Sequence, residues 1–111
     1  MSEPISIIFQ FGDGGTHDAS TSETSASQPV CYQHGWLLTP IGLTLDANPT
    51  YTLEVSNDGT NWQAYDSRIT NAAINQPFDD THMNGLFFRI VYNAQTNTTG
   101  TVEFQIVMKQ G

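Results

Sequence analysis

Residues 51–65 constrain the fold more than any other stretch of the chain. Two short runs of alternating apolar and polar residues flank a polar segment with the sequence SNDGTN. An alternation with a period of two is typical of half-buried β-strands. Asn57, Asp58 and Gly59 tolerate the positive φ of a tight turn, and Trp62 is large enough to close the end of a small core. The stretch therefore predicts a β-hairpin with a structural turn.

Apolar residues alternate with polar ones in most of the remaining chain as well. No amphipathic helix is expected, because Gly, Pro, Asn, Thr and β-branched residues interrupt every candidate window. Strands are expected at about residues 4–11, 29–34, 36–45, 51–56, 62–65, 68–74, 86–92 and 101–109, and the pair at 62–74 is alternatively one kinked strand. These segments predict an all-β fold: a single antiparallel β-sandwich, jelly-roll-like, of about seven or eight strands.

Residues 86–92 are apolar on both faces of the expected strand, apart from Arg89. A strand with two apolar faces is buried on both sides, so this one is expected in the middle of a sheet. Arg89 then either extends to the rim of the sheet or pairs with an acidic residue such as Glu54 or Glu103.

The longest polar segment lies at about residues 13–28. Such a composition buries too little apolar area to offset the conformational entropy lost on ordering. We therefore expect a loop or arm that becomes ordered by packing against a neighbouring molecule, as long loops in small domains often do. The length of the chain, residues 1–111, suits one domain with one core.

Charge limits the partners of the protein. Eleven acidic residues oppose three basic ones, for a net charge of −8. A field of that sign repels nucleic acid and anionic lipids, and no apolar run is long enough to span a membrane. The start of the chain lacks the pattern of a signal peptide, and the lone Cys31 excludes an internal disulfide. We expect synthesis in a reducing cytoplasm, followed by assembly into something larger.

Chemistry-bearing motifs are weak in this sequence. Asp79, Asp80 and His82 share a predicted loop and are metal-ligand types, but their spacing is irregular, and a solvated acidic loop is the alternative. The segment 57–59 lacks the ligand spacing of a calcium loop. No phosphate-binding loop, nucleophile elbow or dinucleotide fingerprint is present. We expect no catalytic, cofactor-binding or metal-binding residues, and hence a protein that is not an enzyme.

Aromatic residues give a second set of candidate surface groups. Some of them are expected either to form a sugar-stacking platform or to pack in the core and at sheet edges. The residues considered for surface interaction are Trp36, Tyr65, Asp79, Asp80 and His82.

The order of motifs in residues 51–109 resembles that of small bacteriophage virion structural proteins of the capsid-associated, decoration or tail type. The similarity rests on Thr52–Trp62, the aromatic strand Leu86–Tyr92 and Gly100–Phe104. The same order is similar to discoidin-type sandwiches, in which a strand, Ser-x-Asp-Gly-x-x-Trp and a second strand precede an Arg-bearing strand. The resemblance covers about half of the chain, and the polar segment 13–28 departs from it. It implies a discoidin-like or jelly-roll β-sandwich and transfers no catalytic residue.

Two functions follow as expectations. The first is a non-enzymatic virion structural protein, such as a capsid, penton, decoration or spike component. It would form homo-oligomers and contact other virion proteins through surface loops and the polar arm. It would be made in the host cytoplasm and reside in the virion. The alternative is a carbohydrate-binding module for host receptor recognition, using exposed Trp or Tyr residues and the loops beside Asn57.

Overall fold

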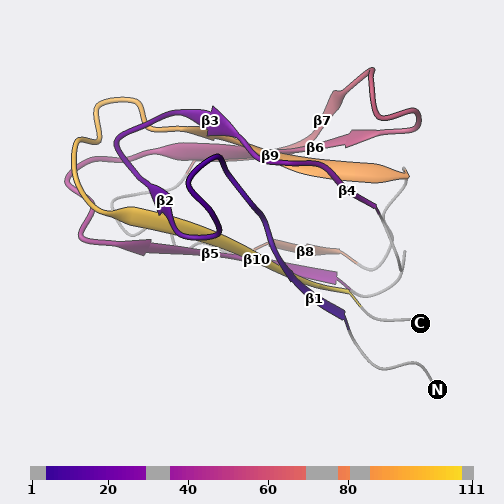
Figure 1. Cartoon of the computed structure of the whole chain (residues 1–111), viewed down its shortest axis with the longest axis horizontal. Coiled ribbons are helices and arrows are strands. Elements are labelled where there is room, and N and C mark those ends of the chain that lie inside the picture. Colours follow the sequence, from indigo (N-terminus) through magenta and orange to yellow (C-terminus); the bar gives the residue numbers. More distant parts are fainter. Residues whose placement is uncertain (1–4, 30–35, 70–77, 81–85, 109–111) are drawn as a thin grey trace.

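The protein is a sandwich of two antiparallel sheets in the computed structural model, which describes residues 5–29, 36–69, 78–80 and 86–108 (Figure 1). One sheet has the order β1-β10-β5-β8 and also holds β2 beside β10; the other has the order β3-β9-β6-β7 and also holds β4 beside β9. The described residues form β1 (Ile5–Ile8), β2 (His17–Asp18), β3 (Glu23–Thr24), β4 (Gln28–Pro29), β5 (Trp36–Leu43), β6 (Thr50–Ser56), β7 (Gln63–Ile69), β8 (Phe78–Asp80), β9 (Phe87–Asn93) and β10 (Thr101–Met108). None of these residues belongs to a helix that could cross a membrane.

The strand pairs are nested around the turn at Asp58 and Gly59. Strand β6 pairs with β7, β5 with β8, β4 with β9, and β1 with β10, all antiparallel. The chain is therefore one long hairpin, rolled up so that β10 also pairs with β5 and β9 also pairs with β6. Such nesting is the arrangement of a jelly roll, and it confirms the predicted fold class.

The core lies between the two sheets and follows the predicted alternation. On β10 the inward side chains are Val102, Phe104, Ile106 and Met108, and each is at most 1% exposed. Alternate residues of a strand point to opposite faces, so their neighbours on β10 point outward. The aromatic ring of Phe104 lies 5.0 Å from that of Tyr51 on the facing sheet.

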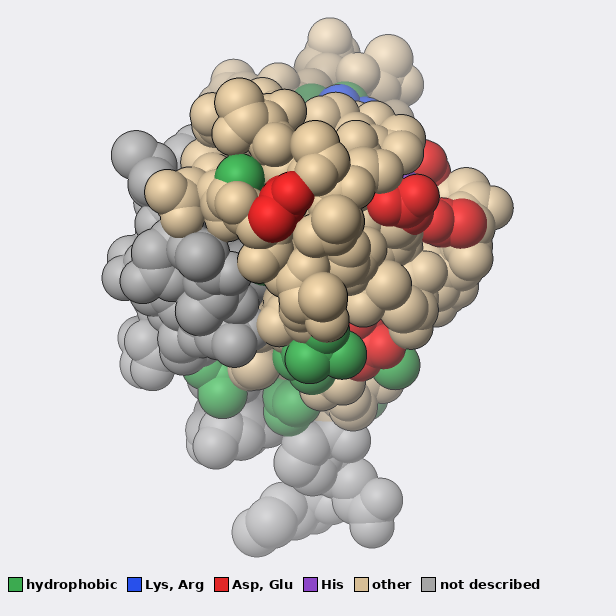
Figure 2. Space-filling view, turned by 90° about the vertical axis from the view of Figure 1, so that its left-hand side faces the viewer, with side chains coloured by type: hydrophobic (Ala, Val, Ile, Leu, Met, Phe, Trp, Pro, Cys, Tyr) green, Lys and Arg blue, Asp and Glu red, His purple; other side chains and the backbone are tan. Residues whose placement is uncertain are grey.

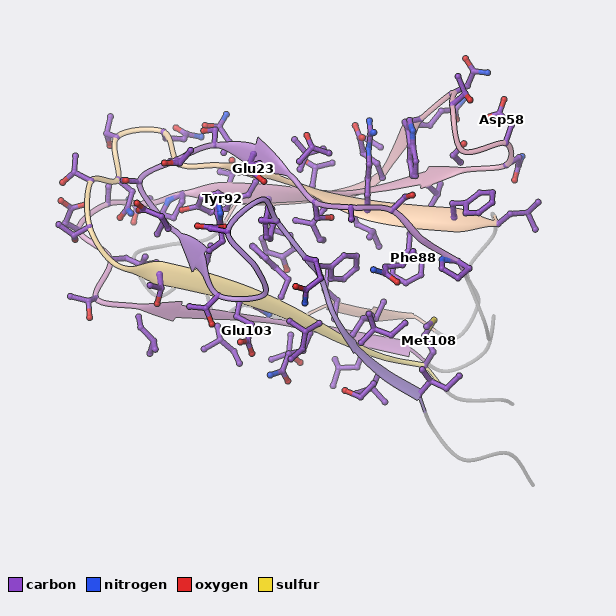
Figure 3. All side chains as sticks on the ribbon, in the orientation of Figure 1. Glu23, Asp58, Phe88, Tyr92, Glu103 and Met108 are labelled. Atoms are coloured by element: carbon purple, nitrogen blue, oxygen red, sulfur yellow. The ribbon has the colours of Figure 1, made fainter. Side chains whose placement is uncertain are left out.

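Strand β9 is central, as its two apolar faces predicted, because β6 flanks it on one side and β3 and β4 flank it on the other. Phe88, Ile90 and Tyr92 are buried on its inner face. Figure 3 shows Phe88 and Tyr92 between the two sheets. The hydroxyl of Tyr92 donates a hydrogen bond to the Ala19 carbonyl at 2.7 Å, which leaves this buried polar group satisfied.

The polar segment, residues 13–28, is not an arm, and we call it the strap. It contains β2, which pairs with β10, and β3, which pairs with β9, so it crosses from one sheet to the other (Figure 1). The amide of Ser25 donates to the Ile90 carbonyl at 2.8 Å, and the Ile90 amide donates to Ser25 Oγ at 2.9 Å. His17, Ala19 and Ser25 are buried. The expectation that a neighbouring molecule orders this segment was wrong, since its order comes from hydrogen bonds and burial within the chain.

Other boundaries also differ from those predicted. Phe78–Asp80, expected in a loop, forms β8, because β5 offers it a hydrogen-bonding partner. Residues 63–69 form one strand, and its pairing with β6 shifts register between Leu53 and Glu54. Of the two predicted alternatives, one kinked strand fits this irregularity. Residues 30–35, within the strand expected at 29–34, lie outside the described part.

Gly100 occupies a position that only glycine fits. Its φ is 89°, and an added Cβ would lie 2.2 Å from the Leu43 carbonyl oxygen. Gly59 has a similar φ of 78°, but a Cβ there would meet only the Phe87 ring, at 3.8 Å. A side chain at either position would strain the backbone, whereas a steric clash with the neighbouring backbone would arise only at Gly100.

We predict that Gly100→Ala destabilises the protein more than Gly59→Ala. The left-handed backbone costs an alanine roughly 1–2 kcal/mol at either site, and the clash at Gly100 adds about 1–3 kcal/mol more. Urea denaturation of the two variants measures the difference in the free energy of unfolding. Equal losses would contradict the tight approach of Gly100 to the β5 backbone.

Candidate functional site

The predicted structural turn is held by the side chains of its own residues. Asp58 Oδ1 accepts hydrogen bonds from the amides of Asn61 and Thr60, both at 2.8 Å, and Ser56 Oγ accepts one from the Gly59 amide at 2.9 Å. The bonds to Asp58, with that of the Asn61 amide foremost, hold the pKa of Asp58 well below its ordinary value. Figure 3 shows Asp58 at the tip of the hairpin. The carboxylate therefore serves the turn.

The outer face of the β9 sheet carries an ion pair under an aromatic ring. Arg89 and Glu54 lie directly opposite each other on β9 and β6, and Arg89 Nε donates to Glu54 Oε1 at 2.8 Å. The guanidinium carbon lies 4.1 Å from the centre of the Trp62 ring, a cation–π distance. Glu54 is thus the partner of Arg89. Trp62 does not close the core, because it packs on the outside against this ion pair. We call Glu54, Trp62, Phe87, Arg89 and Val91 the arginine face.

The outer face of the β10 sheet is aliphatic. Ile8, Leu37 and Leu43 are 39%, 43% and 60% exposed, and they share this face because the register pairs them with outward residues of β10. Two partly exposed aliphatic side chains, Ile41 and Val107, lie on the same face. We call these five residues the aliphatic face. Figure 2 shows hydrophobic side chains gathered along the lower edge of the molecule, where this sheet lies.

Acidic groups are few on the aliphatic face. Glu103 lies opposite Ile41, Asp18 lies opposite Thr101 at one end, and Asp79 takes the position opposite Leu37. The Glu103 carboxylate accepts a hydrogen bond from the Gln105 amide group at 2.7 Å. Among the side chains described for this face there is no Lys or Arg. The face therefore mixes aliphatic with polar side chains and carries a net negative charge.

His17 is a buried residue that the sequence reasoning missed. It is 1% exposed; its Nδ1 lies 2.7 Å from Asp13 Oδ1, its Nε2 lies 2.7 Å from the Thr21 carbonyl oxygen, and its ring stacks on Phe11 at 4.4 Å. The hydrogen bond with His17 is the main reason that the pKa of Asp13 is lowered. No sequence signal marks His17, because its neighbours are polar and show no alternation.

The His17 cluster has the residue types of a metal site. Ligand atoms of Asp13, His17 and Glu23 lie within 4.8 Å of one another. Both ring nitrogens of His17 already have hydrogen-bond partners, and the Glu23 carboxylate accepts the Gly12 amide. These hydrogen bonds hold the strap in place, so the cluster has a structural role.

The residues considered for surface interaction are divided between the sheets. The pairing of β5 with β8 places Trp36 opposite Asp80 and Leu37 opposite Asp79. Tyr65 belongs to β7, in the other sheet. The prediction for His82 lies outside the described residues.

The comparisons with known proteins add one structural relative. No family model and no curated protein matches the sequence. Among solved structures, the chain is similar to the SPBc2 prophage-derived protein YomS, with a TM-score of 0.61 and 14% identity over 96% of each chain. At this identity the similarity shows a common fold.

We predict that acid destabilises the protein through hydrogen-bonded carboxylates. The pKa values are lowered from 3.8 for Asp13, Asp18, Asp46 and Asp58. Below that pH the unfolded chain binds more protons than the folded chain, so the free energy of unfolding falls as the pH falls. Urea denaturation between about pH 2 and pH 6 measures the slope. Asp58→Asn should flatten it, and an unchanged slope would show that the turn bonds do not matter.

Proposed function

We propose that the chain is a non-enzymatic structural protein of a bacteriophage virion, as a capsid, penton, decoration or spike component. The aliphatic face is the observation that carries this proposal. Its five aliphatic side chains lie outward on one sheet, with polar residues between them, and exposed groups of apolar side chains often mark interaction surfaces. The fold of the prophage-derived protein YomS supports a phage origin. The protein would assemble as a homo-oligomer and contact other virion proteins.

The construction of the sandwich supports a role as a building block. Strands β1 and β2 pair along one edge of β10, and β3 and β4 pair along one edge of β9. Strands β1 to β4 have only two to four residues, and short edge strands are poor templates for pairing with another chain; β8 and β7 form the opposite edges. We propose that subunits meet through the outer faces and the loops.

The chemistry of the described side chains supports a non-catalytic role. His17 is the histidine among them, and both of its ring nitrogens are engaged inside the molecule. The acidic residues with lowered pKa values accept hydrogen bonds from backbone amides and neighbouring side chains, which is a structural use of a carboxylate. The net charge of −8 favours protein partners over nucleic acid.

Carbohydrate binding is the second candidate, favoured by the position of Trp62. Its ring is partly exposed beside the polar hairpin loop, and sugars stack on such rings in many binding modules. The Arg89 guanidinium already lies against this ring, at 4.1 Å. A hollow of about 260 Å³ between β3 and β9 adds no platform, since its aromatic residue, Tyr92, is buried. Assembly is therefore the better supported function.

We predict that the protein is an integral part of phage particles. Virions that carry a tagged copy of the chain, purified on a density gradient, should contain it in several copies per particle by quantitative mass spectrometry. A virion component co-sediments with the particles after a high-salt wash, because the apolar contacts persist when charges are screened. Its absence from washed particles would overturn the proposal.

A glycan array separates the second candidate from the first. We expect the purified protein to bind no glycan, and Trp62→Ala to leave that result unchanged. Binding that is lost in Trp62→Ala and retained in a loop variant such as Asn48→Asp would favour receptor recognition instead.

A further inference from the structure

The two outer faces of the sandwich differ in chemistry. The aliphatic face offers branched apolar side chains with Glu103 and Asp18 among them, and Asp79 takes the register position opposite Leu37. The arginine face offers two aromatic rings and a guanidinium held between Glu54 and Trp62. Each subunit therefore presents two unlike surfaces on opposite sides.

Charge distinguishes two ways in which copies can meet. Joining two aliphatic faces brings the acidic groups of both subunits into one interface, where no described basic group offsets them. Like charges placed together across an interface oppose association. Joining the aliphatic face of one subunit to the arginine face of the next places Glu103 and Asp18 on the side where Arg89 lies. Because Arg89 is already paired with Glu54 there, the acidic groups then meet an ion pair without net charge instead of a second set of acidic groups.

The arginine face also has the residue types that dominate protein interfaces. Trp and Arg carry much of the binding energy where they are held in place before association. Arg89 is held by its hydrogen bond to Glu54 and by the Trp62 ring, and its side chain remains 28% exposed. Little side-chain freedom is left for it to lose on binding.

We propose that copies of this chain associate front to back, with the aliphatic face of one subunit on the arginine face of the next. A contact between unlike surfaces is heterologous, so it closes into a ring or continues as a filament. This inference rests on the proposed role in assembly and names the surfaces that carry it.

The size of the aliphatic face favours a ring or filament over an isolated pair of subunits. Three strands about 4.8 Å apart and eight residues long cover roughly 400 Å² of sheet. A stable interface usually buries about 800 Å² on each partner. One contact alone is then weak, whereas ring closure gives every subunit two contacts.

The test uses one variant on each face of the full-length chain. Leu43→Asp changes the aliphatic face at a side chain that is 60% exposed, so the new charge is solvated in the monomer. Arg89→Ala removes the guanidinium from the arginine face. Asn48→Asp, in the loop between β5 and β6, adds the same charge as Leu43→Asp away from both faces. Circular dichroism and thermal unfolding verify that each variant folds.

Sedimentation equilibrium over a range of concentrations gives the masses. We expect oligomers for the unmodified protein and for Asn48→Asp, and 12.2 kDa monomers for Leu43→Asp and Arg89→Ala alone. An equimolar mixture of the two face variants retains one intact pair of surfaces and should form dimers that grow no further.

Three results would overturn the inference. Oligomers of Arg89→Ala together with monomers of Leu43→Asp would show that two aliphatic faces meet instead. Oligomers of both variants would place the contact on other surfaces. A monomeric unmodified protein that is nevertheless present in washed particles would remove the front-to-back contact and leave the virion role intact.

Discussion

The turn at Ser56–Asn61 is the constraint on which the rest of the structure depends. Its carboxylate and hydroxyl groups satisfy the turn amides and so hold the antiparallel start of β6 and β7. Each outer pair, from β5 with β8 to β1 with β10, continues that register outward. Closing the inner pair shortens the loop that the next pair must close, which lowers its entropic cost. A slip of one residue would turn every paired side chain to the opposite face.

Sequence alternation predicted the core because the register is regular where the strands are long. Phe104 and Ile106 are buried and Gln105 between them is not, as a period of two requires. The strap and β8 escaped prediction for a different reason. The strap is held by backbone hydrogen bonds and by small or polar buried residues such as Ser25 and His17, which leave no periodic pattern. The position of Trp62 depended on Arg89, a residue distant in sequence, so local reasoning placed it in the core.

The same period that fills the core also builds the surfaces. Every buried residue of β10 and β5 implies an outward neighbour, and on β5 those neighbours are mainly branched aliphatics. On β9 and β6 they include an arginine, a glutamate, a phenylalanine, a valine and threonines. The alternation in the sequence therefore already contained the residues of both outer faces. From the sequence alone, these outward residues were treated only as solvent-facing. Recognising the two faces required knowing which strands are neighbours, which the sequence does not state.

The strap covers one edge of β10 and one edge of β9 with short strands. By pairing along β10 and β9 it occupies backbone groups that would otherwise invite strand addition. Its anchor is internal, because His17 joins Asp13 and the Thr21 carbonyl beneath the ring of Phe11. A chain with a net charge of −8 repels its own copies over most orientations. The proposed front-to-back contact would therefore join apolar side chains to a face without net charge, where a second set of acidic groups is absent among the described side chains.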